Sequence, residues 1–418
     1  MATEPFSTAS TTAASRWALA FIFATMFVDT IGLGIVIPVT PSIIADLTGQ
    51  GMSGAARYGG WLMFVFAGML FLFSPLIGNL SDRFGRRPVL IASLVAIGID
   101  YTITGLAPTI GWLFVGRILS GMAGASYTTA NAYIADVSPP ERRAANFGLV
   151  GAAFGIGFVV GPALGGLLGH VSDRLPFFAA AGLALANALF GLFVLKESLP
   201  RENRRAFDWR RANPLGAIAA IRNYPTMFGL VGVLILMRLA HDANPAIWSF
   251  YVYLKFNWSK LDVGFAMAFM GLAMALVYGV LTRLAVPRLG EWRAAYVGLL
   301  CGAIGFAGYA FATAGWQMYA WMLVWSLMGL AMPAFNAIMS SQVPANRQGE
   351  LQGALASIGG LTSVVAPPLL TNVFGYFTSA GAPIYFPGAA FFAAGAMLAL
   401  AALMLTRMRQ TPRPQVAE

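Results

Sequence analysis

Residues 131–162, "NAYIADVSPPERRAANFGLVGAAFGIGFVVGP", recur 205 positions later as residues 336–367, "NAIMSSQVPANRQGELQGALASIGGLTSVVAP". The two stretches align without a gap, and nine of their 32 positions are identical. Shared apolar composition alone would give far fewer matches. Because the offset is close to half of the 418 residues, the repeat predicts a chain built from two similar halves.

The composition places these halves in a membrane. The chain is 58% hydrophobic and 10% charged, with a mean hydropathy of +0.72, whereas soluble domains are about 45–50% apolar and about 25% charged. The net charge of +10 does not require a nucleic-acid partner, because membrane proteins collect Lys and Arg in cytoplasmic loops. The single cysteine, Cys301, excludes an internal disulfide.

Twelve apolar runs are long enough to cross the hydrocarbon, which takes about 20 helical residues. Several contain Gly or Pro, which buried membrane helices tolerate. These runs predict an all-α membrane protein with twelve transmembrane helices in two pseudo-symmetric six-helix bundles. To within a few residues, the spans are 17–39, 58–80, 88–107, 111–135, 146–170, 176–196, 226–251, 262–285, 293–313, 316–338, 350–374 and 386–406.

The charges of the connecting segments predict the orientation. Of the 26 Lys and Arg, 20 lie in the two terminal segments and the even-numbered loops, four lie in the odd-numbered loops and two lie inside spans. This bias places both termini in the cytoplasm. It also supports the number of spans, because a missed helix would move every later loop to the other side.

The spans divide the chain into five parts. We expect a cytoplasmic tail over 1–16, a six-helix bundle over 17–196, a cytoplasmic linker over 197–225, a second bundle over 226–406 and a cytoplasmic tail over 407–418. The first tail lacks the features of a cleaved signal peptide. The chain is therefore expected to be a multi-pass protein of the cell (inner) membrane.

The repeat carries spans 4 and 5 onto spans 10 and 11, so the two halves have the same orientation. Such halves are related by an axis along the membrane normal, and they are typical of transporters whose halves rock about a site near the midplane. A channel or a receptor does not need this arrangement.

Several motifs occur in order along this framework. "GNLSDRFGRRPVL" (78–90) is similar to the signature of the major facilitator superfamily between helices 2 and 3, and "GFVVGPALGG" (157–166) resembles the helix-5 motif of its proton-driven exporters. "DTIGLGIVIPVTP", "IDYTITG", "GRILSGMAGA", "IAD" and "RQGELQGAL" resemble its tetracycline/proton antiporter branch. The resemblance implies the major facilitator fold and a monomer that exchanges protons for a small amphipathic organic molecule.

The segment 78–90 places a charged turn between two apolar runs. Gly78 and Gly85 predict a tight turn. Its arginines anchor the loop in the cytoplasm, but this does not explain Asp82, because aspartate contributes little to orientation. The resemblance implies a latch in which Asp82 pairs with an arginine or a helix N-terminus of a neighbouring span in the outward-facing state and releases in the inward-facing state. The arginines assigned to the latch are Arg83, Arg86, Arg87, Arg142 and Arg347.

Five charged residues lie well inside predicted spans: Asp29, Asp100, Arg117, Arg238 and Asp242. A charge at the bilayer centre costs about 2.5–3.5 kcal/mol on insertion scales, so such residues usually face a cavity or a partner. Asp29 and Asp100 have no cationic neighbour in the sequence. A carboxyl group in such surroundings can bind and release a proton near neutral pH, which is the chemistry of a proton carrier.

Each charge also has a simpler interpretation. Arg238 and Asp242 are four residues apart and either neutralise each other or contact substrate. Arg117 ties span 4 to its neighbours or, as the resemblance implies, takes part in proton coupling. Asp136 is an ordinary interfacial residue or lines the entrance to the site. His241 is a hydrogen-bonded core residue or relays protons with the neighbouring carboxylate.

Small residues form a ridge along span 5. Such a ridge indicates close helix packing, and the resemblance adds a bend that seals the halves against proton leakage. The residues assigned to this motif are Gly157, Gly161, Pro162, Gly165 and Gly166.

The sequence contains no nucleotide-binding loop, metal-ligand cluster or nucleophile elbow. We therefore expect no enzyme activity, no cofactor, no metal and no nucleic-acid partner, and a transport cycle driven by a proton gradient. The first hypothesis is export of amphipathic organic molecules or drugs. The alternatives are an importer of a small organic solute and a receptor or scaffold on the same fold. Met274 stands where tetracycline exporters carry a histidine in helix 8, so tetracycline is one candidate substrate among several.

Overall fold

The computed structural model describes residues 8–124, 126–207, 227–344 and 347–410, which form helices with no strand among them. The first half contains α1 (Thr8–Ile35), α2 (Thr40–Thr48), α3 (Met52–Phe84), α4 (Arg86–Leu106), α5 (Ile110–Ala123), α6 (Ser126–Val137), α7 (Pro140–Val171), α8 (Leu175–Val194) and η1 (Arg201–Asn203). The second half contains α10 (Phe228–His241), α11 (Ala243–Phe256), α12 (Lys260–Leu276), η5 (Val277–Leu281), α13 (Thr282–Leu289), α14 (Glu291–Phe311), α15 (Gly315–Ser326), η6 (Leu327–Leu330), α16 (Ala331–Ser340), α17 (Gln348–Phe377) and α18 (Ala389–Gln410).

These helices confirm the predicted all-α membrane fold. Within the described residues, ten helical segments are long and apolar enough to cross a membrane, and the bent pair α1–α2 makes an eleventh. The predicted fourth span falls on α5 and α6, with Ala125 between them outside the described residues. Helix α1 begins at Thr8, inside the segment predicted as a tail. Of the predicted linker, residues 208–225 lie outside the described residues.

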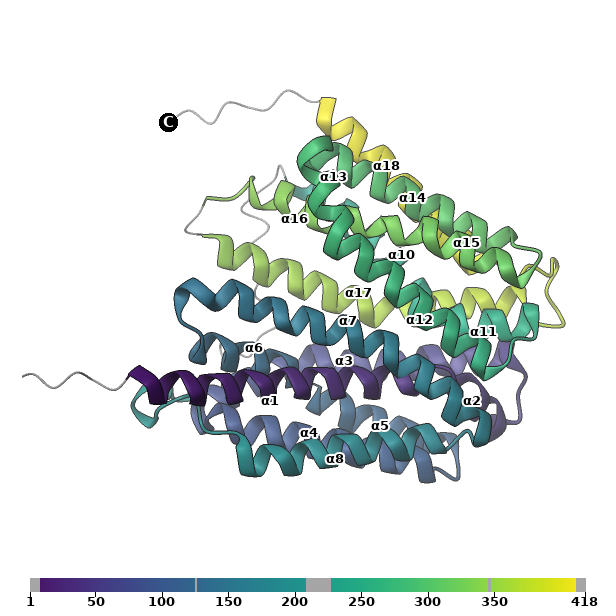
Figure 1. The fold of residues 1–418 in the computed structure, drawn as a ribbon. Helices are drawn as coiled ribbons and strands as arrows, with labels where there is room; N and C mark the ends of the chain where they lie inside the picture. The colour runs from purple at the N-terminus through teal and green to yellow at the C-terminus, as the bar shows by residue number, and fades with distance from the viewer. Residues whose placement is uncertain (1–7, 125, 208–226, 345–346, 411–418) are drawn as a thin grey trace, which may run out of the picture.

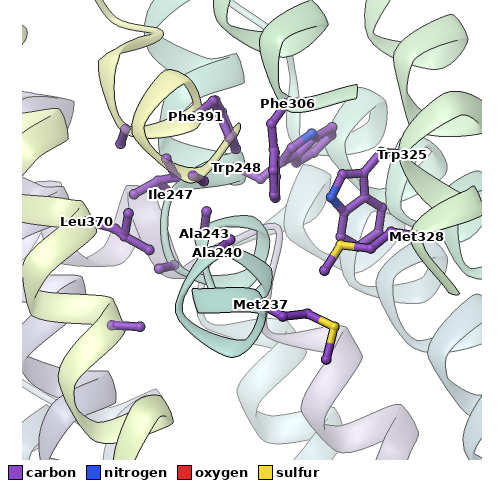
Figure 2. Close-up of a cluster of buried hydrophobic side chains, with 14 of the residues drawn as sticks. Met237, Ala240, Ala243, Ile247, Trp248, Phe306, Trp325, Met328, Leu370 and Phe391 are labelled. Carbon is purple, nitrogen blue, oxygen red and sulfur yellow. The ribbon is translucent and has the colours of Figure 1, made fainter. Parts of the chain in front are cut away.

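The two halves lie one above the other in Figure 1, with the purple-to-teal helices α1–α8 below and the green-to-yellow helices α10–α18 above. Across the boundary, α7 packs against α12 and α3 packs against α17. The second half has a large apolar core around α10 and α11. Figure 2 shows Trp248 of this core beside Phe306 and Phe391, and Met237 below Trp325 and Met328.

Two spans are broken near prolines. Helices α1 and α2 meet at 47°, and Pro38 and Pro41 lie at this bend. Helix α10 ends at His241 and α11 begins at Ala243. Pro245 explains this second break, because a proline inside a helix lacks the N–H donor and its ring clashes with the carbonyl group four residues earlier, here that of His241. The break places Asp242 between two helices in the middle of a span.

The turn between the second and third spans is shorter than predicted. Gly78 lies inside α3, so the prediction that it takes part in the turn is wrong. Gly85 alone separates α3 from α4, at a φ of 106° that favours glycine. A β-carbon on Gly85 would also lie 2.2 Å from Oε2 of Glu197. The helix continues through Gly78 because a membrane helix tolerates glycine inside it.

The halves meet at the end opposite the arginine-rich loops. There, a β-carbon on Gly60 of α3 would lie 3.1 Å from the carbonyl oxygen of Pro367 on α17, and one on Gly166 of α7 would lie 2.7 Å from that of Lys260 on α12. Three polar contacts also cross the boundary at this end: Ser53 Oγ to the Thr378 carbonyl at 3.1 Å, Tyr253 hydroxyl to the Pro38 carbonyl at 2.5 Å, and the ion pair of Asp173 with Lys260.

The same helices differ at their other ends. A β-carbon on Gly78 of α3, or on Gly148 or Gly151 of α7, would meet no atom of the described residues within 4 Å. The halves are therefore joined at one end, whereas none of the described residues covers these positions of α3 and α7 at the arginine-rich end.

Candidate transport site

Asp100 is fully buried in the first half, on α4. Its Oδ1 accepts a hydrogen bond of 3.3 Å from the Thr104 hydroxyl, one turn further along the helix. A β-carbon on Gly116 of α5 would lie only 2.3 Å from the same oxygen. Glycine at this position therefore lets the carboxylate lie directly against α5, next to Arg117 in the sequence.

Tyr101 connects these groups to α1. It is buried, and a β-carbon on Gly32 would lie 3.2 Å from its hydroxyl oxygen. Asp29 lies one turn before Gly32 on α1. Arg117, Asp100 and Asp29 all interact electrostatically with the Tyr101 hydroxyl. The structure therefore brings the three predicted charges of the first half together around Tyr101. The sequence did not indicate a role for this residue, although it follows Asp100 directly.

The second half contributes Arg238 and His241 on the last turn of α10, and Asp242 at the break. In the described chain, no ion pair within 4 Å joins Arg238 to Asp242, although their charges interact. Nδ1 of His241 lies 3.7 Å from Oδ1 of Asp242, and the imidazole is 5.9 Å from the Trp325 ring.

These groups keep unused hydrogen-bonding capacity. Nε of Arg238, Oδ2 of Asp242 and Nε1 of Trp325 are buried and have no hydrogen-bond partner among the described residues. The His241 side chain is 42% exposed. Met274 lies half-buried on α12. The break in the span thus gathers donors and acceptors that a polar ligand could satisfy.

Asp136 lies in a second cluster, at the arginine-rich end. Arg86 pairs with Asp82 at 2.5 Å and with Asp136 at 3.2 Å, and its guanidinium donates to the Ser81 hydroxyl at 2.6 Å. Ser198 also donates to Asp136, at 3.1 Å. Arg86 therefore ties the start of α4 to the ends of α3 and α6.

Glu197 completes this cluster, a role that the sequence did not indicate. Its carboxylate accepts hydrogen bonds from the backbone N–H groups of Arg86 (2.8 Å) and Arg87 (3.3 Å), and it lies 3.8 Å from Arg204. A negative charge at a helix N-terminus is stabilising, because the first N–H groups of the helix have no partner within it. The only local signal was a carboxylate directly after span 6, because the N–H groups that it accepts from at the start of α4 lie more than 100 residues away in the sequence.

The other predicted latch residues lie around this cluster. Arg83 lies over the Phe84 ring at 5.1 Å, and Arg87 donates to the Leu192 carbonyl oxygen at 2.6 Å. Arg142 and Arg347 are exposed near the starts of α7 and α17.

The glycines of the span-5 motif lie in close helix contacts. A β-carbon on Gly161 would lie 2.8 Å from the carbonyl oxygen of Ile31, and one on Gly165 would lie 2.1 Å from that of Ile35. The contacts continue at Gly157, which faces Thr30, and at Pro162, which faces Gly34, while Gly166 faces α12. Helix α7 is thus packed tightly between α1 of its own half and α12 of the other.

Two joined halves with ionisable groups inside their spans define a membrane transporter. The family model described as Major Facilitator Superfamily matches residues 22–367. The chain is 40% identical over 360 residues to the tetracycline resistance protein, class C, of Escherichia coli, covering 86% of this chain and 90% of that protein. It is 36% identical to the class G protein of Vibrio anguillarum, covering 85% and 89%.

Among solved structures, the nucleoside transporter NupG has a TM-score of 0.75 at 15% sequence identity, over 94% of this chain and 100% of that one. The chain belongs to the Major Facilitator Superfamily. It is a multi-pass membrane transporter with a small-molecule substrate, and not an enzyme.

Proposed function

We propose that this transporter exports amphipathic organic molecules in exchange for protons, by alternating access between its two halves. The observation that carries the proposal is the group of Asp29, Asp100 and Arg117 around Tyr101 inside the first half. Two carboxylates near one guanidinium leave a net negative charge that a proton can neutralise. The names of the relatives point to tetracycline-like compounds as the first substrates to test.

The exchange follows from the change in charge when these carboxylates bind or release a proton. A proton bound on the outer side neutralises the group and lowers the cost of holding it inside the membrane. Release of this proton on the inner side restores the negative charge, which favours the opposite conformation. A ligand that shifts this equilibrium must bind the two states with different affinities, so substrate and proton drive opposite steps.

We assign the described conformation as inward-facing, on the orientation that the loop charges predict. The arginine-rich loops, and with them both termini, are assigned to the cytoplasm of a cell with this protein in its inner membrane. The halves then meet on the outer side. Asp82 is paired with Arg86 at the start of α4, within its own half, in this state, so this contact does not distinguish the two states of the predicted latch. In the outward-facing state we expect Asp82 to contact the start of α17, near Arg347.

The second half is the proposed site of substrate selection. Arg238, His241 and Asp242 carry unused donors and acceptors at the break in span 7, and Met274 replaces the histidine of the resembled branch. An importer driven by protons is the alternative, because buried carboxylates serve either direction. A scaffold with no transport activity would gain nothing from charges buried inside its spans.

Resistance of cells that overexpress the chain tests this function. We expect the protein to raise the inhibitory concentration of tetracycline or of another planar amphipathic antibiotic. Asp29→Asn should abolish this gain, because an amide cannot carry the proton. Asp46→Asn, the same change at an exposed position of α2, should preserve the gain. Full resistance in Asp29→Asn cells would remove Asp29 from the proton pathway.

A further inference from the structure

An ion pair joins the two halves at their closed end. Asp173 follows the C-terminus of α7 in the first half, and Lys260 is the first residue of α12 in the second half. The side chains are only 19% and 28% exposed. Partial burial makes such a pair less screened by salt than one on an open surface.

The surrounding backbone positions Lys260. Ser259 and Asp262 form a capping box that fixes the start of α12. The backbone of Lys260 lies against Gly166, and its aliphatic stem lies 3.5 Å from where a β-carbon on Gly169 would be. Its ammonium group therefore reaches past the end of α7, where the helix dipole also favours a positive charge.

A neighbouring contact crosses the same boundary. The Tyr253 hydroxyl donates to the Pro38 carbonyl oxygen at 2.5 Å, next to the bend between α1 and α2. Asp173 and Asp262 both interact electrostatically with this hydroxyl. The Asp173–Lys260 ion pair and the Tyr253–Pro38 hydrogen bond thus lie together at the outer end of the α7–α12 contact.

We propose that Asp173 and Lys260 form the outer gate of the transporter and set how often its outer side opens. The inference rests on alternating access. When the halves separate on the outer side, α7 and α12 must part, and the pair joining their ends must break. Because the two states of a transporter differ by only a few kcal/mol, one partly buried pair is enough to shift their ratio.

The test measures the two states directly, with full-length protein in lipid nanodiscs and without substrate or a pH gradient. Spin labels on Thr109→Cys and Thr313→Cys, in a Cys301→Ser background, report the separation of exposed outer loops in the two halves. Asp173→Asn and Lys260→Met should each raise the ratio of outer-open to outer-closed molecules by about three- to tenfold. The double reversal Asp173→Lys with Lys260→Asp should restore a ratio close to that of the parent.

Asp46→Asn is the matched control, because it removes an exposed outer carboxylate of the same half. The proposal is overturned if the neutral variants keep the parent distance distribution, if Asp46→Asn shifts it equally, or if the double reversal behaves like the single changes. No substrate is present in this measurement. A negative result would therefore contradict the gate without bearing on the proposed proton exchange. The measurement would also remain valid if the proposed exchange proved wrong.

A second variant tests the gate independently, in case the charge variants fold poorly. Asp173→Cys with Lys260→Cys, joined by a short reducible cross-linker, should hold the outer side closed and stop transport in proteoliposomes, and reduction should restore it. Unchanged transport by the cross-linked protein would show that the two ends need not separate, and would contradict the gate.

Discussion

Gly116 decides how Asp100 lies between α4 and α5. A β-carbon there would lie 2.3 Å from Oδ1 of Asp100 and 3.0 Å from the Thr104 hydroxyl. The Asp100 carboxylate therefore fits only because residue 116 on the neighbouring helix is a glycine and has no side chain. This makes a glycine, rather than a charged residue, a sensitive test of the proposed proton site.

Gly116→Ala should lower pH-driven transport about tenfold or more, because the added methyl group displaces the Asp100 carboxylate from Thr104. A tenfold change corresponds to about 1.4 kcal/mol, within the usual cost of overpacking a core. The measurement is the initial rate of substrate uptake into everted vesicles. Gly111→Ala on the same helix is the control, since its β-carbon would have no neighbour closer than 3.8 Å. Equal rates in the two variants would argue against a role for Asp100.

Helix α7 shows the same dependence on small residues at the scale of an element. Gly157, Gly161 and Gly165 face α1, and the closest approach is at Gly165. These contacts place the backbone of α7 next to the helix that carries Asp29. Tight packing of helix on helix stabilises membrane proteins chiefly through van der Waals contact.

Gly165→Ala should destabilise the protein by about 1–3 kcal/mol, because its β-carbon would lie 2.1 Å from the carbonyl oxygen of Ile35 and must push α1 away. Gly155→Ala on the same helix should change little, since a β-carbon there meets no described atom within 4 Å. Thermal unfolding in detergent compares the two variants. A Gly165→Ala protein as stable as the parent would show that α1 and α7 are not tightly packed.

The elements were largely predictable because their signals are local or repeated. Apolar runs predicted most of the spans, and the match of residues 131–162 with 336–367 predicted two halves. The break at Asp242 was not predicted, although Pro245 was a visible cause, because the hydropathy of the span continues through it. Gly78 was wrongly placed in a turn for the opposite reason: an apolar run that ended near residue 80 concealed a helix that continues to Phe84.

The sequence singled out candidate residues for the site, but it did not indicate how they are grouped. Charges inside apolar runs identified Asp29, Asp100 and Arg117, because burying a charge is costly wherever it occurs. The sequence did not indicate that Tyr101 connects them. Glu197 and the pair of Asp173 with Lys260 depend on contacts between distant segments, and no periodic pattern predicts such contacts.

At the scale of the whole molecule, the described residues of the two halves join at one end of their boundary. Contacts at Gly60 and Gly166 and the pair of Asp173 with Lys260 join one end, whereas a β-carbon on Gly78 or Gly148 would meet no described residue within 4 Å at the other end. The charges around Tyr101 lie inside the first half, among α1, α4 and α5. A structure of this kind can connect the site to one side of the membrane at a time, which is the requirement for exchanging one solute for another.

The most direct test of proton exchange is the movement of protons when substrate is added. Purified protein is reconstituted into proteoliposomes that contain a pH-sensitive dye, with no imposed gradient, and a tetracycline-like substrate is added outside. We predict that substrate uptake moves protons out of the vesicles, and that Asp29→Asn abolishes this signal without preventing substrate binding. Substrate uptake at the parent rate with no change in internal pH would contradict the account.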